Sequence, residues 1–288
     1  MNIKKILTLV AAAALACGLS VPASAVTLVA GDLKVTINGY DAGTIGYGNS
    51  VGVKCNSAVA CDAVPGIVTA PNAFGGEDTW GIFSVQSITR VSNGALIFTA
   101  GTGGEYLIGM FGGIRDTFVE VSGAVVRSTT ALGSGGWLNM YLTNTNYNSS
   151  YGPSGRLSQY GYNGITNIGG TLALSANFGM GVAEDQLTST YISNFQNSTI
   201  AGFGQGYLDV TGGSFASHFD TNAQLDPNGG THDLFLKVTY GKTASSNTAG
   251  WTVDASGDVQ GNAIPEPASL ALFGLGLAGI ACLRRRKA

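Results

Sequence analysis

The stretch Leu234-Phe235-Leu236-Lys237-Val238-Thr239-Tyr240 decides the fold class. Every second residue from Leu234 to Tyr240 is large and apolar or aromatic, and the residues between them are Phe, Lys and Thr. Side chains of an extended chain point alternately to opposite faces, so this period of two is typical of a half-buried antiparallel strand.

Similar runs recur at short spacing along the chain. Asn93-Gly94, Gly112-Gly113 and Gly135-Gly136 are among the turn signals that separate them. The runs cover residues 33–40, 79–91, 95–100, 105–114, 117–127, 137–143, 171–178, 207–211, 233–240 and 250–254. Many short strands with such punctuation predict an all-β fold, which we expect to be an antiparallel β-sandwich of the jelly-roll type.

Two segments depart from this pattern. Residues 182–194 carry Glu184 and Asp185 near their start, and acidic side chains favour the N-terminal end of a helix, so we expect one short helix there. Residues 144–162 are rich in Asn, Ser, Tyr and Gly and are expected to form a long loop.

The body of the chain is acidic and sparsely charged. Only 11% of all residues are charged, and residues 26–264 hold 8 basic and 16 acidic side chains, a formal charge of −8. Phosphate binding requires clustered Lys and Arg, so nucleic acid is not an expected partner. A hydrophobic content of 44% argues against disorder.

The N-terminus has the organisation of a secretory signal peptide. Lys4 and Lys5 precede an apolar run over residues 6–17, and Ala23-Ser24-Ala25 supplies small residues for cleavage. We therefore expect residues 1–25 to be removed by a cut between Ala25 and Val26. Lipidation of Cys17 is the alternative route of processing.

The C-terminus carries a second sorting segment. Pro265-Glu266-Pro267 is followed by 16 uncharged residues, 268–283, and then by the basic cluster Arg284-Arg285-Arg286-Lys287. As a short apolar helix this stretch would span about 24 Å, less than the ~30 Å hydrocarbon core, which makes a weak permanent anchor. The basic cluster is expected to stay in the cytoplasm.

Pro265-Glu266-Pro267, the apolar stretch and the terminal Arg284-Arg285-Arg286 resemble, in this order, the PEP-CTERM sorting signal of Gram-negative bacteria. The resemblance covers residues 264–288. It implies recognition by an exosortase, a membrane cysteine protease, after transient anchoring in the inner membrane. Proteins of this family are exported to the cell surface or extracellular matrix and are tied to exopolysaccharide, biofilm and floc formation.

These segments divide the chain into four parts. We expect a signal peptide at 1–25, a β-sandwich body at 26–254, a linker at 255–264 and the sorting signal at 265–288. The body keeps two cysteines, Cys55 and Cys61, and an even pair in an exported chain predicts a disulfide. A metal site is the alternative for this pair, but no His lies nearby, so we expect no metal.

Catalytic patterns are absent from the sequence. It contains no G-x-S-x-G or H-E-x-x-H motif, and we expect His232 to be a turn residue. Glu77 and Asp78 are adjacent, so in a strand they would point to opposite faces and converge poorly. We therefore expect no enzyme and no cofactor, although two acids distant in sequence could still form a glycosidase site.

The segment Asp226-Pro227-Asn228-Gly229-Gly230 is the densest cluster of oxygen ligands. The twelfth position counted from Asp226 is Lys237 rather than the Glu of an EF-hand loop. We expect an Asx turn, with a calcium site as the alternative.

Aromatic residues suggest contact with carbohydrate. We expect Trp80, Trp137 and Trp251 to lie in the core. The tyrosines of the long loop are candidates for contact with a sugar, with core packing as the alternative: Tyr147, Tyr151, Tyr160 and Tyr162.

The expected function depends on the family resemblance. It implies an exported, non-enzymatic surface or extracellular-matrix protein associated with exopolysaccharide, biofilm or floc formation. The alternative is a carbohydrate-binding protein with a defined sugar site, and a secreted glycoside hydrolase is a third possibility.

Overall fold

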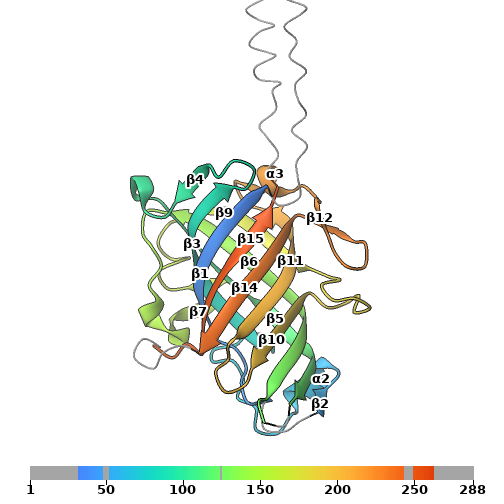
Figure 1. Ribbon diagram of the computed structural model, residues 1–288. Helices are drawn as coiled ribbons and strands as arrows, with labels where there is room; N and C mark the ends of the chain where they lie inside the picture. Colours follow the sequence, from blue (N-terminus) through green and yellow to red (C-terminus); the bar gives the residue numbers. More distant parts are fainter. Residues whose placement is uncertain (1–31, 48–51, 124, 243–248, 263–288) are drawn as a thin grey trace, which may run out of the picture.

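Eight long antiparallel strands close into a barrel in the computed structural model, which describes residues 32–47, 52–123, 125–242 and 249–262 (Figure 1). Each of these strands pairs with the next one along the chain, and the last pairs with the first. They are β1 (Leu33–Asp41), β3 (Thr79–Arg90), β5 (Tyr106–Ser122), β6 (Ser128–Thr143), β9 (Thr171–Gly179), β11 (Gly202–Gly212), β14 (Leu234–Lys242) and β15 (Val253–Gly261).

The all-β, antiparallel fold class is confirmed, but the two-sheet jelly roll is replaced by a barrel of consecutively paired strands. Closure satisfies the backbone groups that would otherwise line two open edges. Alternation along a strand specifies which side chains face inward, but not whether the first and last strands meet. That is why the sequence suggested a sandwich.

One position in the barrel wall is filled by two strands in succession. Between β6 and β11, β9 occupies one half of the barrel height, and β10 (Tyr191–Gln196) occupies the other. The helix expected at 182–194 is therefore wrong. Residues up to 190 form turns, and the chain then returns as a strand because β6 and β11 both offer unpaired backbone there.

Strand β15 corrects the expected domain boundary. Residues 255–261, assigned to a linker from their polar and glycine-rich composition, lie in the barrel wall between β14 and β1. At Gly257 a Cβ atom would lie 2.5 Å from the carbonyl oxygen of Lys237, so only glycine fits. Close packing against β14 accounts for a composition that resembles a linker.

The glycine pairs in β5 and β6 are bends rather than turns. Gly113 and Gly135 have positive φ angles, 76° and 72°, inside strands that pair on both sides of them. Two runs expected as separate strands, 105–114 and 117–127, are consequently a single strand, β5. The pair 112–113 faces 135–137, so both strands bend at the same height.

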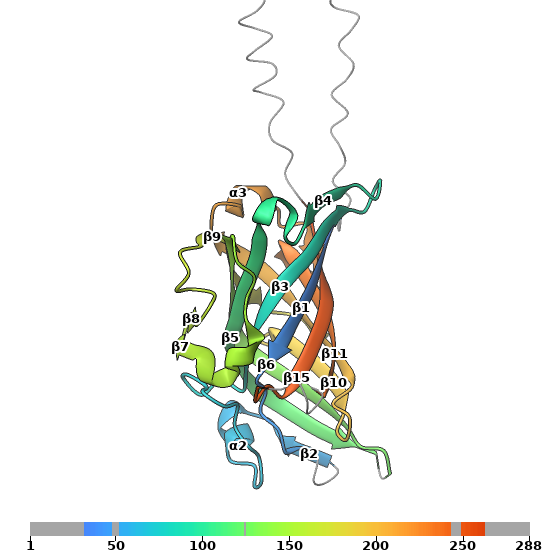
Figure 2. The same ribbon diagram turned by 90° about the vertical axis from the view of Figure 1, so that its left-hand side faces the viewer.

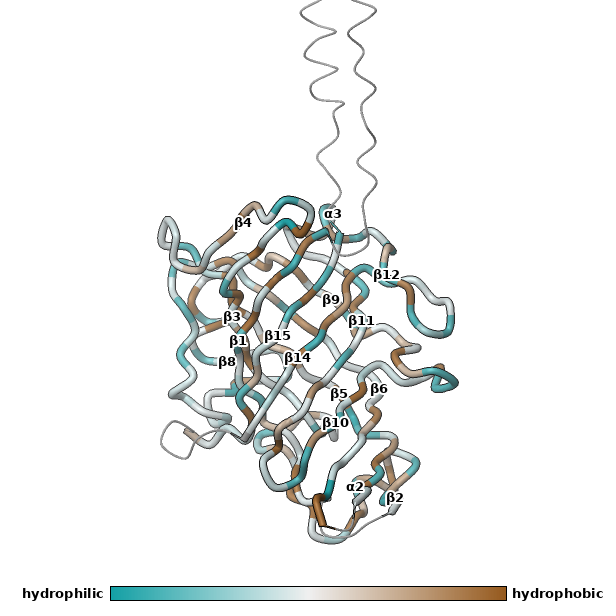
Figure 3. Tube along the Cα trace, in the orientation of Figure 1, coloured by the Kyte–Doolittle hydropathy of each residue, from teal (hydrophilic) through white to brown (hydrophobic). Residues whose placement is uncertain are grey.

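The core fills the inside of the barrel. Leu234, Leu236 and Val238 belong to it, as the alternation in the sequence predicted, and Tyr240 packs against it. Apolar and polar residues alternate along several barrel strands in Figure 3. Phe215 and Phe219, beside and within the short helix α3 (Ala216–Phe219), pack against the core at one end of the barrel.

A second cluster lies outside the barrel wall. Trp80, Trp251 and Tyr162 pack together there, under the chain that connects β6 to β9 (Figure 2). That connection contains η3 (Ser149–Tyr151), η4 (Pro153–Gly155) and a two-stranded sheet of β7 (Arg156–Ser158) and β8 (Gly161–Tyr162). The expected loop is thus a folded excursion that covers the wall.

Smaller helices and strands lie near the two ends of the barrel. They are β2 (Gly52–Cys55), α2 (Ala58–Asp62), β4 (Leu96–Thr99), η2 (Thr102–Gly104), β12 (Gln224–Leu225) and β13 (Thr231–His232). Within the described ranges no helix has the length and apolar character needed to cross a membrane. The signal peptide, the cleavage position Ala25–Val26 and the apolar helix expected at 268–283 lie outside the described residues.

Candidate functional site

The two ends of the barrel differ in what their inward positions carry. The terminal end is the one where Asp32 and Asn262 meet, with the backbone N–H of Asp32 donating to Asn262 Oδ1 at 3.3 Å. The opposite end, where β1 finishes and β3 begins, contains a cavity of about 580 Å³. We call this end of the barrel the cavity end. A cavity of this volume suits a small ligand.

The inward face turns polar as the strands reach the cavity end. On β1 the core residue Ile37 is followed, four positions on, by Asp41, and on β5 the core residue Ile114 is followed by Asp116. On β14, Val238 is followed by Tyr240. Period-two alternation thus delivers polar groups into the barrel at this end.

Three carboxyl groups line the cavity. Asp41 accepts a hydrogen bond from Thr79 Oγ1 at 2.7 Å, and burial raises the pKa of Asp41 to about 7. Burial, with the neighbouring charge of Asp78, raises the pKa of Asp116 to about 8. Burial also raises the pKa of Asp78, which accepts hydrogen bonds from Thr44 Oγ1 at 3.1 Å and from the Asp116 backbone N–H at 2.7 Å. Neutral carboxyl groups near pH 7 are unusual and mark functional sites in many proteins.

Phenol groups complete the lining. Tyr47, Tyr191 and Tyr240 all face the cavity, and burial raises the pKa of each. Tyr240 donates a hydrogen bond to the Phe203 carbonyl oxygen at 2.8 Å. The Tyr47 hydroxyl lies close enough to Asp116 to affect its pKa, but it has no partner at hydrogen-bonding distance in the described structure.

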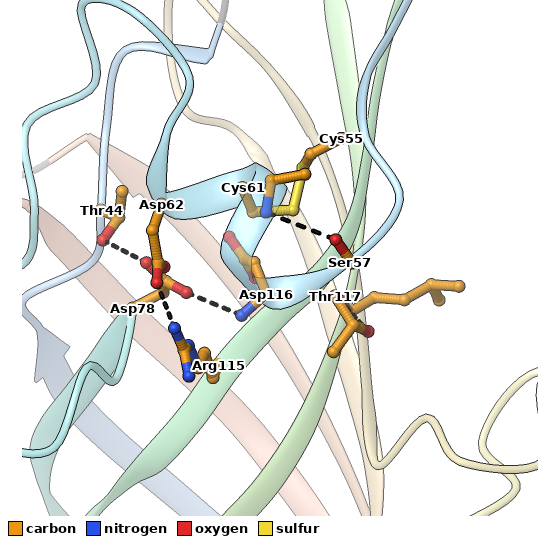
Figure 4. Close-up of a disulfide and its surroundings, with 11 residues drawn as sticks. Thr44, Cys55, Ser57, Cys61, Asp62, Asp78, Arg115, Asp116 and Thr117 are labelled. Carbon is orange, nitrogen blue, oxygen red and sulfur yellow. Dashed lines mark hydrogen bonds and ion pairs between the residues drawn. A yellow bond between two sulfur atoms is a disulfide. The ribbon is translucent and has the colours of Figure 1, made fainter.

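A disulfide holds the rim of the cavity end. Cys55 and Cys61 are bonded (Figure 4), which confirms the prediction. Both belong to a buried cluster with Tyr47 and Val119. Ser57 caps α2 by accepting from the Ala60 backbone N–H at 3.3 Å. At the end of α2, Asp62 pairs with Arg115 of β5 (Figure 4).

A second hollow, of about 600 Å³, lies on the outside of the barrel wall. Tyr40 and Tyr147 line it, with their ring centroids 6.4 Å apart, and Tyr40 also stacks on Trp251 at 6.0 Å. Its polar lining includes Asn38, Gln86, Asn146 and Asp254. We call this hollow the outer groove.

The four loop tyrosines do not form one site. Tyr147 lies in the outer groove, whereas Tyr162 is fully buried and donates a hydrogen bond to the Gly152 carbonyl oxygen at 3.0 Å. Tyr151 and Tyr160 are exposed, and Tyr160 packs edge-on against Trp137. Tyr162 therefore has no surface for a sugar. The core assignment of the three tryptophans is confirmed, since Trp80, Trp137 and Trp251 are all buried.

His232 is a buried strand residue rather than the expected turn residue. Its ring nitrogens lie 2.8 Å from Asp209 Oδ1 and 3.3 Å from Asp226 Oδ2, and the ring stacks on Tyr207. Asp226 Oδ1 accepts from the backbone N–H groups of Asn228 and Gly230, which confirms the Asx turn. Both carboxylates thus hold His232 in place and tie the β12–β13 sheet to β11.

Glu77 and Asp78 diverge as expected from adjacent positions. Glu77 pairs with Arg156, both side chains being buried, while Asp78 lies at the cavity. The Arg156 guanidinium lies over the Trp80 ring, 4.3 Å from its centroid. This pair fastens the folded excursion to the barrel. Among the described residues no group of three or more His, Cys, Asp or Glu has an arrangement that would hold a metal ion.

The family comparison concerns the C-terminal segment, outside the described residues. The model of the PEP-CTERM protein-sorting motif matches residues 263–287, which include Pro265, Glu266, Pro267 and the Arg cluster 284–286. No curated protein and no solved structure matches the chain. The motif is a substrate signal for exosortase and marks an exported protein. The chain thus carries the PEP-CTERM protein-sorting motif of an exported protein directly after a closed β-barrel.

Proposed function

We propose that the protein is a non-enzymatic component of the cell surface or extracellular matrix, which acts together with exopolysaccharide in biofilms or flocs. The observation that carries this proposal is the sorting motif at 263–287. A motif that marks a substrate for exosortase directs the barrel out of the cytoplasm and through a transient stay at the inner membrane.

The position of the motif supports release of an intact barrel. Strand β15 ends at Gly261, and the motif match begins at residue 263. A cut at or near Pro265-Glu266-Pro267 therefore leaves every barrel strand uncut. Because the motif follows the terminal end directly, the cavity end lies on the far side of the barrel from the attached tail.

The contacts of His232 and Glu77 support a structural role for these two groups rather than catalysis. His232 is enclosed by two carboxylates and a tyrosine ring, and Glu77 is engaged by Arg156. General acid–base chemistry requires such groups to reach a substrate, and these groups are occupied by structural contacts.

A deletion strain tests the proposal. Loss of the gene should reduce cell aggregation while polysaccharide production continues, and the complete gene should restore aggregation. A gene encoding Glu266→Ala should fail to restore it and should leave the protein in the membrane fraction. Glu184→Gln is the matched control, because it also removes one negative charge, at an exposed position of the barrel. Normal aggregation in the deletion strain would contradict the proposal.

The outer groove favours carbohydrate binding as the alternative function. Two tyrosine rings bordered by Asn, Gln and Asp side chains offer the apolar faces and hydrogen-bonding groups that sugars require. A glycan array should then show binding that Tyr147→Ala abolishes and Tyr151→Ala leaves unchanged, because Tyr151 lies outside the groove. Hydrolysis of the native polysaccharide would instead favour a glycoside hydrolase.

A further inference from the structure

Two acidic groups of the cavity end have no cationic partner among the residues that the structure describes. Asp41 and Asp116 form no ion pair with Lys or Arg in the described part of the chain. Burying carboxylates without a counter-charge is costly, and both groups respond by staying protonated up to about neutral pH. Arg127 also lines the cavity, against the three carboxyl groups of Asp41, Asp78 and Asp116.

A second observation points to a ligand in the same cavity. The Tyr47 side chain is 4% exposed and lines the cavity. Its hydroxyl lies near the Asp116 carboxyl, but no group among the described residues is within hydrogen-bonding geometry of it. Buried hydroxyl groups nearly always have a partner, so an orphaned one calls for an explanation. A ligand with N–H groups would supply the donor that the hydroxyl oxygen lacks.

The remaining walls match the carbon skeleton of an organic molecule. Tyr191, Tyr240 and Phe195 present aromatic rings to the cavity, and Ile45 and Val253 present aliphatic groups. Aromatic faces attract cations as well as apolar groups. The volume of about 580 Å³ is far larger than a bare metal ion needs.

We propose that this cavity binds a small organic ammonium ion, with its nitrogen among Asp41, Asp116 and Tyr47 and its carbon skeleton against the aromatic walls. The ammonium group would supply the missing positive charge and so stabilise the ionised form of the carboxyl groups. A neutral alcohol of the same shape would not. The proposal is independent of the matrix function, since the barrel could bind such a ligand wherever it is located.

Binding must be accompanied by proton release. The titratable and charged groups that face the nitrogen site come from several elements. They are Asp41 of β1, Asp78 just before β3, Asp116 of β5, Tyr47, Tyr191 and Tyr240, with Asp62 and Arg115 behind the rim and Arg127 in the lining. At pH 7 Asp116 is largely protonated in the empty cavity, because its pKa is raised to about 8. A nearby ammonium ion stabilises the ionised form, so its binding expels a proton to the buffer.

Calorimetry on the exported protein, purified from the host that makes it, tests the proposal with n-hexylammonium and 1-hexanol as matched probes. Hexylammonium should bind at least tenfold more tightly than hexanol at pH 7. Its heat of binding should differ between phosphate and MOPS buffers, which have different ionisation enthalpies, by an amount corresponding to proton release. Hexanol should give the same heat in both buffers.

Two variants locate the binding. Asp116→Asn should weaken hexylammonium binding at least tenfold and remove most of the proton release. Asp185→Asn, the same change at an exposed turn residue, should leave both unchanged. Equal affinity for the two probes, heats that do not depend on the buffer, or no binding at millimolar concentration would each overturn the proposal. If Asp116→Asn fails to fold, the unaltered protein still tests the proposal through the relative affinity of the two probes and the buffer dependence of their heats of binding.

Discussion

An aspartate stands at each end of strand β1, and the two carboxyl groups have opposite environments. Asp32, just before the strand at the terminal end, is hydrogen-bonded by Ser92 and paired with Arg90 at 2.5 Å, and these contacts lower its pKa. Asp41, the last residue of the strand, is half-buried at the cavity end, and desolvation raises its pKa to about 7. The terminal end is thus built for stability, whereas the cavity end retains groups that would be more stable with a partner.

The largest expected effect lies in the apolar interior between the two ends. Leu208 is 1% exposed in the core. Leu208→Ala should lower the free energy of unfolding by about 3–5 kcal/mol, because it removes buried methyl groups and leaves a void. Urea denaturation measures this. Leu187→Ala is the control, since Leu187 is 65% exposed and its truncation should cost little. A small loss for Leu208→Ala would mean that the interior is loosely packed throughout.

The second prediction concerns pH and separates the two ends directly. A buried Asp with a raised pKa is protonated in the folded state while the unfolded state ionises above about pH 4, so it destabilises the fold as pH rises. For Asp41 and Asp116 this loss should develop between about pH 4 and pH 8, where their folded pKa values of about 7 and about 8 lie. It should reach about 4–6 kcal/mol, on the order of one fully shifted group, because each tenfold change in proton affinity is worth about 1.4 kcal/mol.

Urea denaturation across this pH range, in buffers without organic amines, measures the loss. Asp116→Asn should flatten the curve and stabilise the protein at pH 8. The contribution of Asp32 to the free energy of unfolding depends on pH in the opposite direction, because its pKa is lowered. Its contribution is present above about pH 4 and is lost as pH falls below that. Stability that rises steadily from pH 4 to pH 8 would contradict the assignment of the cavity carboxyls.

The third prediction concerns the disulfide at the rim. Replacing Cys55 and Cys61 together by Ser should cost about 2 kcal/mol, because the bond closes a short loop. Hydrogen exchange should quicken in β2, α2 and the adjacent part of β5, while the β1–β15 ladder at the terminal end keeps its protection. Alkylation of the unreduced protein should leave both cysteines unmodified. Free thiols in fresh protein would contradict the bond.

The smallest effect is expected at the outer surface of the terminal end. Lys34 and Asp258 form an ion pair at 3.1 Å with side chains 45% and 37% exposed. Exposed pairs contribute little, so Asp258→Asn should change the free energy of unfolding by less than about 1 kcal/mol. The effect should shrink further in high salt. A loss as large as that of Leu208→Ala would show that this pair, rather than the core, secures the terminal end.

Several features of the site lay beyond the sequence for identifiable reasons. Asp41 and Asp116 lie 75 positions apart in the chain, and only pairing of β1 and β5 with the same strand, β3, brings them together. Their signal was faint: each is an acidic residue at an inward position of an alternating run. Tyr162 was misplaced because a Tyr-, Asn- and Gly-rich segment resembles a loop even where it folds back over tryptophans. His232 was misplaced because its two partners come from other parts of the chain.

The sequence by itself determined the local properties of this protein. Alternation in the segment 234–240 specified antiparallel strands, two cysteines in an exported body specified the disulfide, and a contiguous stretch of 25 residues specified the sorting motif. Each of these depends on neighbours in the chain. Only the tertiary structure decided that the strands close into a barrel, that residues 253–261 belong to its wall, and that three carboxyl groups share one cavity. Those outcomes depend on contacts between distant segments, which local patterns do not encode.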